Sequence, residues 1–90
     1  MPNWRLPEFE WDDGNEQHLI GRHSVYPEDA EAVFFNRPFI RRVGDQFEVL
    51  GRDDSGRFLF LMCLERQSRI RIFSGRDMTV TERRRYERQK

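Results

Sequence analysis

The sequence predicts an α+β fold, in which two N-terminal helices and a C-terminal helix pack on a small, mostly antiparallel sheet. Three observations support this prediction. Helix-start signals precede the short apolar runs that lie before residue 36. Beyond Pro38, several runs alternate apolar with polar residues and are separated by turns containing glycine and aspartate, as in β-hairpins. A Thr-x-x-Glu pattern near the C-terminus is typical of one further helix start.

The size and composition of the chain indicate a single domain over residues 1–90, with its core at about residues 8–88. Leu, Ile, Val and Phe make up about a quarter of the residues, above the roughly one-fifth below which chains stay disordered. No apolar run approaches the roughly 18–20 residues of a membrane helix, and the first residues lack the apolar stretch of a signal peptide. The one cysteine, Cys63, lies in the most apolar segment, so we expect a buried thiol in a cytoplasmic protein.

The first three elements follow from aromatic spacing and helix-capping residues. Residues 8–11 alternate acid with aromatic, the pattern of a half-buried strand whose aromatic side chains face inward. Asp12 or Asp13 can cap a helix over residues 14–22, because a short carboxylate accepts hydrogen bonds from the free amides of the first turn. A proline opens a second helix over residues 27–35, where its missing N–H costs nothing.

Four strands are predicted in the second half of the chain. Residues 39–43 and 46–52 flank a Gly-Asp turn, and residues 53–56 form the next hairpin loop. Residues 57–65 contain an unbroken apolar run, which is typical of a strand covered on both faces, so we place it at the centre of the sheet. Residues 69–72 alternate arginine with isoleucine, so both arginines lie on the face away from the core.

The last helix begins after Thr79 and ends near Gln89. The Thr79 hydroxyl and the Glu82 carboxylate match a capping box, in which each side chain bonds to the other residue's backbone amide. Tyr86 is nearly the only large apolar residue of this helix, so no broad apolar face holds it on the sheet.

The formal net charge of zero conceals a division along the chain. Residues 1–36 carry eight acidic and two basic side chains, and residues 37–90 carry an excess of six positive charges. Such asymmetry points to a polyanion or an acidic protein as partner. All but one of the 16 basic residues are arginine, whose planar group binds phosphate or carboxylate through two parallel hydrogen bonds. A genome composition that favours arginine codons would explain the same bias.

A set of short motifs, none specific alone, follows a recognisable order and spacing. They are Phe9-Glu10-Trp11-Asp12, Asn15, Arg22-His23-Ser24-Val25, an acidic helix ending at Val33-Phe34, Gly51-Arg52, residues 69–76 and residues 82–87. Together they resemble the BrnT family of type II toxins. The resemblance implies a RelE-like ribonuclease that cuts RNA without metal or cofactor and so inhibits translation. It further implies neutralisation by a BrnA-like ribbon-helix-helix antitoxin, through which alone the toxin would meet operator DNA.

Metal-free RNA cleavage needs a base for the 2′-hydroxyl proton, cations for the phosphorane, and an acid for the departing 5′-oxygen. His23 matches the histidine of the family and is the candidate base or acid, because an imidazole titrates near neutral pH. A histidine that fixes the interhelix turn by hydrogen bonding is the alternative. His18 lies inside the first helix, where we expect a structural role.

Three arginines, Arg52, Arg71 and Arg76, come from successive stretches of the predicted sheet or its end, and we expect them to converge on one phosphate beside His23. Singly, each would be a solvated surface arginine. Tyr86 is expected to donate a proton to the leaving group or stack on a base, or else to anchor its polar helix on the sheet.

Further basic residues are expected to bind the RNA backbone or an acidic antitoxin: Arg69, Arg83, Arg84, Arg85 and Arg88. A solvated helical tail is the third reading of the last four. No metal site is predicted, because His18 and His23 are five residues apart, off the spacing that puts two ligands on one helix face, and Cys63 stands alone.

A non-catalytic binding module is the alternative function, either a degenerate toxin or a co-repressor acting with its antitoxin. Asp13-Gly14 stands where the family has a lysine, and residues 22–25 replace the Lys-His-Gly-Val of the family.

Overall fold

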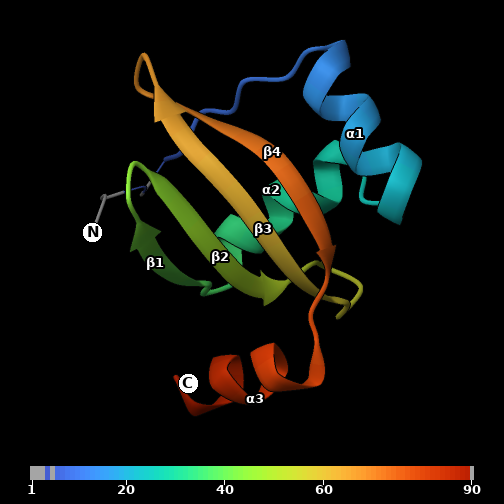
Figure 1. Ribbon diagram of the computed structural model, residues 1–90, viewed down its shortest axis with the longest axis vertical. Coiled ribbons are helices and arrows are strands. Elements are labelled where there is room, and N and C mark those ends of the chain that lie inside the picture. Colours follow the sequence, from blue (N-terminus) through green and yellow to red (C-terminus); the bar gives the residue numbers. More distant parts are fainter. Residues whose placement is uncertain (1–3, 5, 90) are drawn as a thin grey trace.

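A four-stranded antiparallel sheet organises the protein, as Figure 1 shows for the computed structural model, which describes residue 4 and residues 6–89. The strands lie side by side in chain order, β1-β2-β3-β4, so each pairs with the next through a hairpin. The elements are α1 (Asp13–His23), α2 (Pro27–Phe35), β1 (Phe39–Val43), β2 (Gln46–Arg52), β3 (Phe58–Arg66), β4 (Arg69–Asp77) and α3 (Val80–Arg88). This arrangement confirms the α+β prediction.

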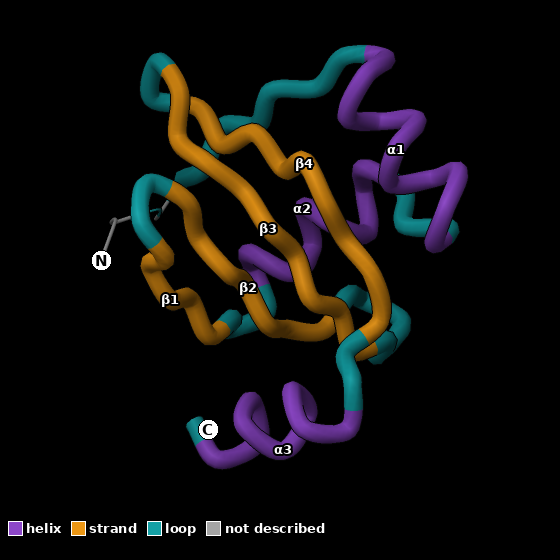
Figure 2. Tube along the Cα trace, in the orientation of Figure 1, coloured by secondary structure: helices purple, strands orange, loops and turns teal. Residues whose placement is uncertain are grey.

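Helix α2 lies behind the sheet and α1 lies beside β4 (Figure 2); both pack on the face that we call the inner face. Helix α3 lies at one end of the strands, where its Tyr86 contacts Phe58 on the other, outer face. The core between the helices and the inner face includes Leu19, Val33, Leu61 and Ile72, all fully buried. A Cβ atom built on Gly51 of β2 would lie only 2.6 Å from Val33 Cγ1. A glycine is therefore required at this position for α2 to approach the sheet so closely.

Capping residues fix where two of the helices begin. The Asp12 carboxylate accepts a hydrogen bond from the Asn15 amide, and the Asn15 side chain accepts one from the Asp12 amide, so Asp12 is the cap of α1 among the two predicted candidates, Asp12 and Asp13. Thr79 and Glu82 form the predicted capping box at the start of α3. The buried Asn15 side chain also donates to the carbonyl of Ile72, which ties α1 to β4.

The prediction of a strand over residues 8–11 is wrong, because only an isolated bridge forms there. Phe9 forms a single parallel bridge to Ile70, through two backbone hydrogen bonds at the edge of β4. The pairing ends there because the chain turns at Asp12 into the cap of α1. Phe9 and Trp11 nevertheless pack against the core, as the alternating pattern predicts.

The prediction that the central apolar strand is covered on both faces is also wrong. Inward-facing residues of β3 such as Leu59 and Leu61 are fully buried, whereas Phe58, Phe60 and Met62 on the outer face stay half-buried. The reason is that α3 covers only one end of the outer face. The predicted position of β3 inside the sheet, between β2 and β4, is confirmed.

Two further expectations concern burial and the membrane. Cys63 is fully buried as predicted, and burial raises the pKa of its thiol to about 12. In the part of the chain that the structure describes, no helix has the length and apolarity needed to cross a bilayer.

Candidate functional site

Strand register gathers arginines and aromatic rings on the outer face beside α3. Arg52 of β2 pairs with Phe58 of β3, and Phe60 of β3 pairs with Arg76 of β4. Residues two apart on a strand share a face, so these four side chains lie on one patch. Arg83 reaches the same patch from α3. We call these five residues the arginine–aromatic surface.

The guanidinium groups of this surface stack on its rings. Arg83 and Arg52 have their Cζ atoms 3.9 and 4.7 Å from the centroid of Phe58, and Arg76 has its Cζ atom 4.2 Å from the centroid of Phe60. A stacked guanidinium keeps its N–H edge available in the plane of the group, where phosphate oxygens bind. The rings thus orient three cations, of which Arg83 also forms a 3.8 Å ion pair with Glu87 of α3.

Arg76 is also held by a carboxylate of α3. Two of its nitrogens lie 2.7 and 2.9 Å from the two oxygens of Glu82, whose side chain is 15% exposed. The hydrogen bond from Arg76 lowers the pKa of the Glu82 carboxyl, and Glu82 raises the pKa of Arg76, so both are charged at neutral pH. A phosphate at Arg76 must compete with this carboxylate or bind beside it.

Tyr86 anchors α3 on the sheet. Its side chain is 2% exposed, and its ring meets the Phe58 ring edge-on with centroids 6.1 Å apart. Tyr86 also lines two adjoining depressions of ≈ 520 and ≈ 370 Å³, which share Arg37 as a second wall. The larger one is lined by Arg52 as well, so it continues from the arginine–aromatic surface.

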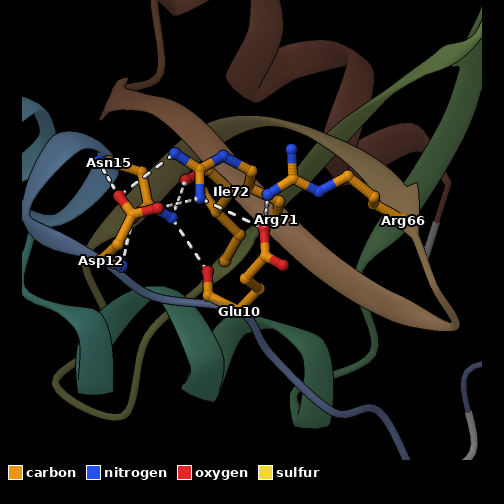
Figure 3. A network of polar contacts seen from close by, with 6 residues as sticks. All are labelled: Glu10, Asp12, Asn15, Arg66, Arg71 and Ile72. Carbon is orange, nitrogen blue, oxygen red and sulfur yellow. Dashed lines mark hydrogen bonds and ion pairs between the residues drawn. The ribbon is translucent and has the colours of Figure 1, made fainter.

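Arg71 does not join Arg52 and Arg76, contrary to the expectation of convergence. Its guanidinium donates to the Asp12 carboxylate at 2.7 and 3.2 Å and to Glu10 at 3.2 Å, in the network that Figure 3 shows. Arg71 pairs with Leu64 on β3, whereas Arg76 pairs with Phe60. These two partners are four residues apart, which corresponds to about 13 Å along the strand. Its ion pairs hold the N-terminal segment against β4, together with an ion pair between Arg66 and Glu10.

His23 ends α1 at the edge of β4 rather than within the arginine–aromatic surface. Its backbone carbonyl accepts a 2.7 Å hydrogen bond from Arg57, which also binds the Asp77 carboxylate. Hydrogen bonding by Arg57 is the main cause of the lowered pKa of Asp77, and the charge of His23 contributes. Within the described part of the chain, no hydrogen bond or ion pair joins either histidine side chain to the surface. The expectation of an imidazole beside the arginines is therefore not met in this conformation.

The side chains of the remaining basic residues point in different directions. Arg85 points inward and donates to Glu48 of β2 at 3.3 Å. Arg84 and Arg88 are exposed on the far side of α3 and form no hydrogen bond or ion pair with any described residue. Arg69 is exposed at the start of β4, at the opposite end of the strand from Arg76.

Comparison with known proteins gives an independent result. Residues 11–82 match the family model described as "Ribonuclease toxin, BrnT, of type II toxin-antitoxin system". The chain belongs to the BrnT family. The crystal structure of the ribonuclease toxin BrnT from Brucella abortus has a similar fold, with a TM-score of 0.63 and 17% sequence identity over 82% of this chain and 99% of that one. No curated protein matches the sequence. BrnT proteins are described as ribonuclease toxins of type II systems, whose toxins have an antitoxin as partner.

Sequence reasoning missed several residues of this BrnT site. Phe58 and Phe60 were expected beneath a second layer, and Glu82 was assigned to the cap of α3 alone. Strict alternation along β3, aligned with the arginines of its neighbours, would have revealed the two rings. Arg37, between α2 and β1, offers no local signal of its role. Among the described residues, no cluster of histidine, cysteine and carboxylate side chains suits a metal ion.

Proposed function

We propose that this protein is a type II toxin with a RelE-like fold that cleaves RNA internally, without metal, and thereby inhibits translation in the cytoplasm. The observation that carries the proposal is the stacking of three guanidinium groups over Phe58 and Phe60, in a chain of a ribonuclease toxin family. This surface offers cationic charge for phosphates beside half-buried aromatic rings, the two kinds of group that single-stranded RNA contacts.

In the proposed reaction, a base removes the proton of the RNA 2′-hydroxyl and the 2′-oxygen attacks the adjacent phosphorus. The bond to the 5′-oxygen then breaks, and an acid protonates that oxygen, leaving a cyclic phosphate and a 5′-hydroxyl. Arg52 and Arg76 stabilise the charge that develops on the phosphorane, because their N–H groups are oriented before the substrate arrives. Arg83 binds a neighbouring phosphate. Arg71 serves the proposal only indirectly, by holding the sheet edge.

His23 is the proposed base or acid, and Tyr86 is the second candidate for the acid. Arg57 bonds both to the His23 carbonyl and to the carboxylate of Asp77, which follows Arg76 at the end of β4, so His23 lies near that end of the strand. The exposed His23 side chain must rotate past the strand end to reach a phosphate at Arg76. Tyr86 must give up part of its packing to donate a proton.

The test is incubation of a structured RNA with the purified protein in EDTA at low salt. We expect cleavage that Arg76→Ala reduces about 10²-fold or more, since removing one oriented donor to a developing anion costs that much. Arg42→Ala is the control, because among the described residues Arg42 on β1 bonds only to the Gly44 carbonyl and stacks on Phe47. Intact RNA with a folded wild-type protein would refute the catalytic proposal.

A BrnA-like ribbon-helix-helix antitoxin is the proposed partner, and contact with operator DNA is proposed to occur only through it. The exposed Arg84 and Arg88 support an acidic protein partner, because they remain without a carboxylate among the described residues.

A non-catalytic module remains the second candidate, and the position of His23 outside the arginine–aromatic surface favours it. Expression in a bacterial host separates the two. Growth arrest that His23→Ala and Arg76→Ala both abolish supports the enzyme, whereas indifference to both substitutions supports the module.

A further inference from the structure

An aromatic side chain and a cation lie exposed at the end of α2. Phe35 is 61% exposed, although α2 buries its neighbours Val33 and Phe34. Arg37 follows two residues later with a φ of 53°, in the left-handed region that side chains rarely adopt. It is exposed and makes no hydrogen bond or ion pair with any residue that the structure describes. Neither the core nor the arginine–aromatic surface accounts for these two side chains.

The larger depression brings Phe35 and Arg37 together with Arg52. All three line this depression, which has a volume of ≈ 520 Å³ and lies between the end of α2, the β2–β3 hairpin and α3. Arg52 donates to the Gly56 carbonyl at 3.2 Å, which fixes its guanidinium at the boundary between the depression and the arginine–aromatic surface. A chain that crosses the surface can therefore continue into this groove without leaving the protein.

The two carboxylates of the groove accept hydrogen bonds from groups other than the guanidinium groups of Arg37 and Arg52. One oxygen of the nearly buried Asp53 accepts hydrogen bonds from the Ser55 amide, the Ser55 hydroxyl and the Arg57 amide, so its role is to shape the hairpin turn. The Asp54 carboxylate accepts a 3.0 Å hydrogen bond from Asn36, and neither acid forms an ion pair with an arginine that the structure describes. The hairpin thus builds the groove wall without neutralising Arg37 or Arg52.

We propose that this groove binds one unpaired nucleotide of an RNA strand, with the base stacked on Phe35 and its phosphate held by Arg37, while Arg52 at the boundary binds the phosphate that is cut. The inference rests on the proposed function, since it places the strand next to the phosphate that is cut. An exposed aromatic ring that lines the same groove as two arginines suits single-stranded nucleic acid, because stacking accepts any base and the cations hold the backbone.

The experiment measures binding of a 2′-O-methylated RNA pentanucleotide, which lacks the hydroxyl needed for cleavage. We expect Phe35→Ala to weaken binding about five- to a hundredfold, the range for loss of one stacked base, and Phe35→Trp to retain it. Arg37→Ala should weaken binding and lower the slope of log affinity against log salt by about 0.7, as one lost phosphate contact does for a single strand. The matched controls are Tyr26→Ala and Arg22→Ala, both exposed and outside the groove.

The outcomes separate this inference from the proposed function. If the wild type binds the modified RNA and neither Phe35→Ala nor Arg37→Ala changes the affinity, the proposed groove site is refuted, even where unmodified RNA is cut. Groove-dependent binding with no cleavage of unmodified RNA supports the groove and refutes the enzyme. The inference is also overturned if the wild type does not bind the modified RNA. It is overturned as well if Phe35→Ala and Arg37→Ala weaken only the capture of the antitoxin, because the groove would then belong to a protein partner.

Discussion

The Asp12 carboxylate stabilises the fold in two ways at once. It caps α1 through the Asn15 amide, and it forms a bidentate ion pair with Arg71 of β4. The hydrogen bond from Arg71 is the main reason that the pKa of Asp12 falls to about 2, from an ordinary value of 3.8. A carboxyl whose pKa is lower in the folded state stabilises the fold at pH values above its ordinary pKa. That stabilisation is lost as the pH falls from about 4 to about 2.

Asp12→Asn tests this ion pair while keeping the cap, since asparagine caps helices as well as aspartate. We expect the variant to have a lower free energy of unfolding than the wild type at pH 7. The difference should shrink below pH 4 and vanish only below about pH 2, where most of the wild-type carboxyl is protonated too. Urea unfolding followed by circular dichroism at several pH values measures it.

Asp13→Asn is the control for the Asp12 experiment. Asp13 is the next residue, lies in the first turn of α1 and makes no ion pair with a described residue. Its loss should remove only the weak interaction with the helix dipole. An equal loss of stability in both variants would show that the pairing with Arg71 contributes nothing.

At the scale of elements, the contact of α2 with β2 depends on the missing side chain of Gly51. A Cβ atom there would overlap Val33 Cγ1, and the Pro38 backbone lies 3.5 Å away on another side. Gly51→Ala should therefore lower the free energy of unfolding by about 1–3 kcal/mol, as overpacking of a core does. Gly21→Ala is the matched control, because nothing lies within 4 Å of its Cβ position in α1. That variant should gain about 0.5–1 kcal/mol, since alanine favours a helix. Thermal unfolding of the two variants gives the comparison, and equal effects would argue against the close approach.

Local patterns predicted those elements whose ends carry strong signals. The bounds of α2, β1 and β2 agree with the prediction, because a proline, a Gly-containing turn and an Asp-rich turn mark them. Strand β4 runs on to Asp77, beyond the predicted end at residue 72. A bulge between the partners of Met62 and Cys63 breaks the alternation there, so periodicity alone ends too early.

The candidate site was predictable only where strand register decides it. Arg52 and Arg76 share the outer face because they flank β3, which the order of hairpins already implies. Arg71 shares that face as well, but carboxylates from a segment about 60 residues away in the sequence capture it. Long-range ion pairs of this kind leave no trace in local spacing. The place of His23 depends likewise on Arg57, which fixes the end of α1 through tertiary hydrogen bonds.

At the scale of the whole molecule, folding redistributes the charge asymmetry of the sequence. Acidic Glu10 and Asp12 of the N-terminal segment pair with Arg66 and Arg71 at one end of the β3–β4 hairpin. At the opposite end, on the arginine–aromatic surface and on α3, Arg76, Arg83 and Arg85 pair with glutamates, whereas Arg52, Arg84 and Arg88 form no ion pair with a described residue. RNA and an acidic antitoxin would both be attracted to this end, but they need not use the same side chains.

The direction of the arginines on α3 separates the two partners. Arg83 points to the sheet, where the RNA site is proposed, whereas Arg84 and Arg88 point away from it. The double variant Arg84→Glu with Arg88→Glu should therefore weaken capture by a BrnA-like antitoxin about tenfold or more, because it puts two repulsive charges opposite an acidic partner. Cleavage of RNA should fall much less. A control with the same charge change, Arg22→Glu with Arg42→Glu, places the reversals on α1 and β1. Titration calorimetry with the antitoxin and a cleavage assay on each variant measure the two effects. Equal loss of both activities, or the same loss in the control, would show that the outward side of α3 is not a separate antitoxin surface.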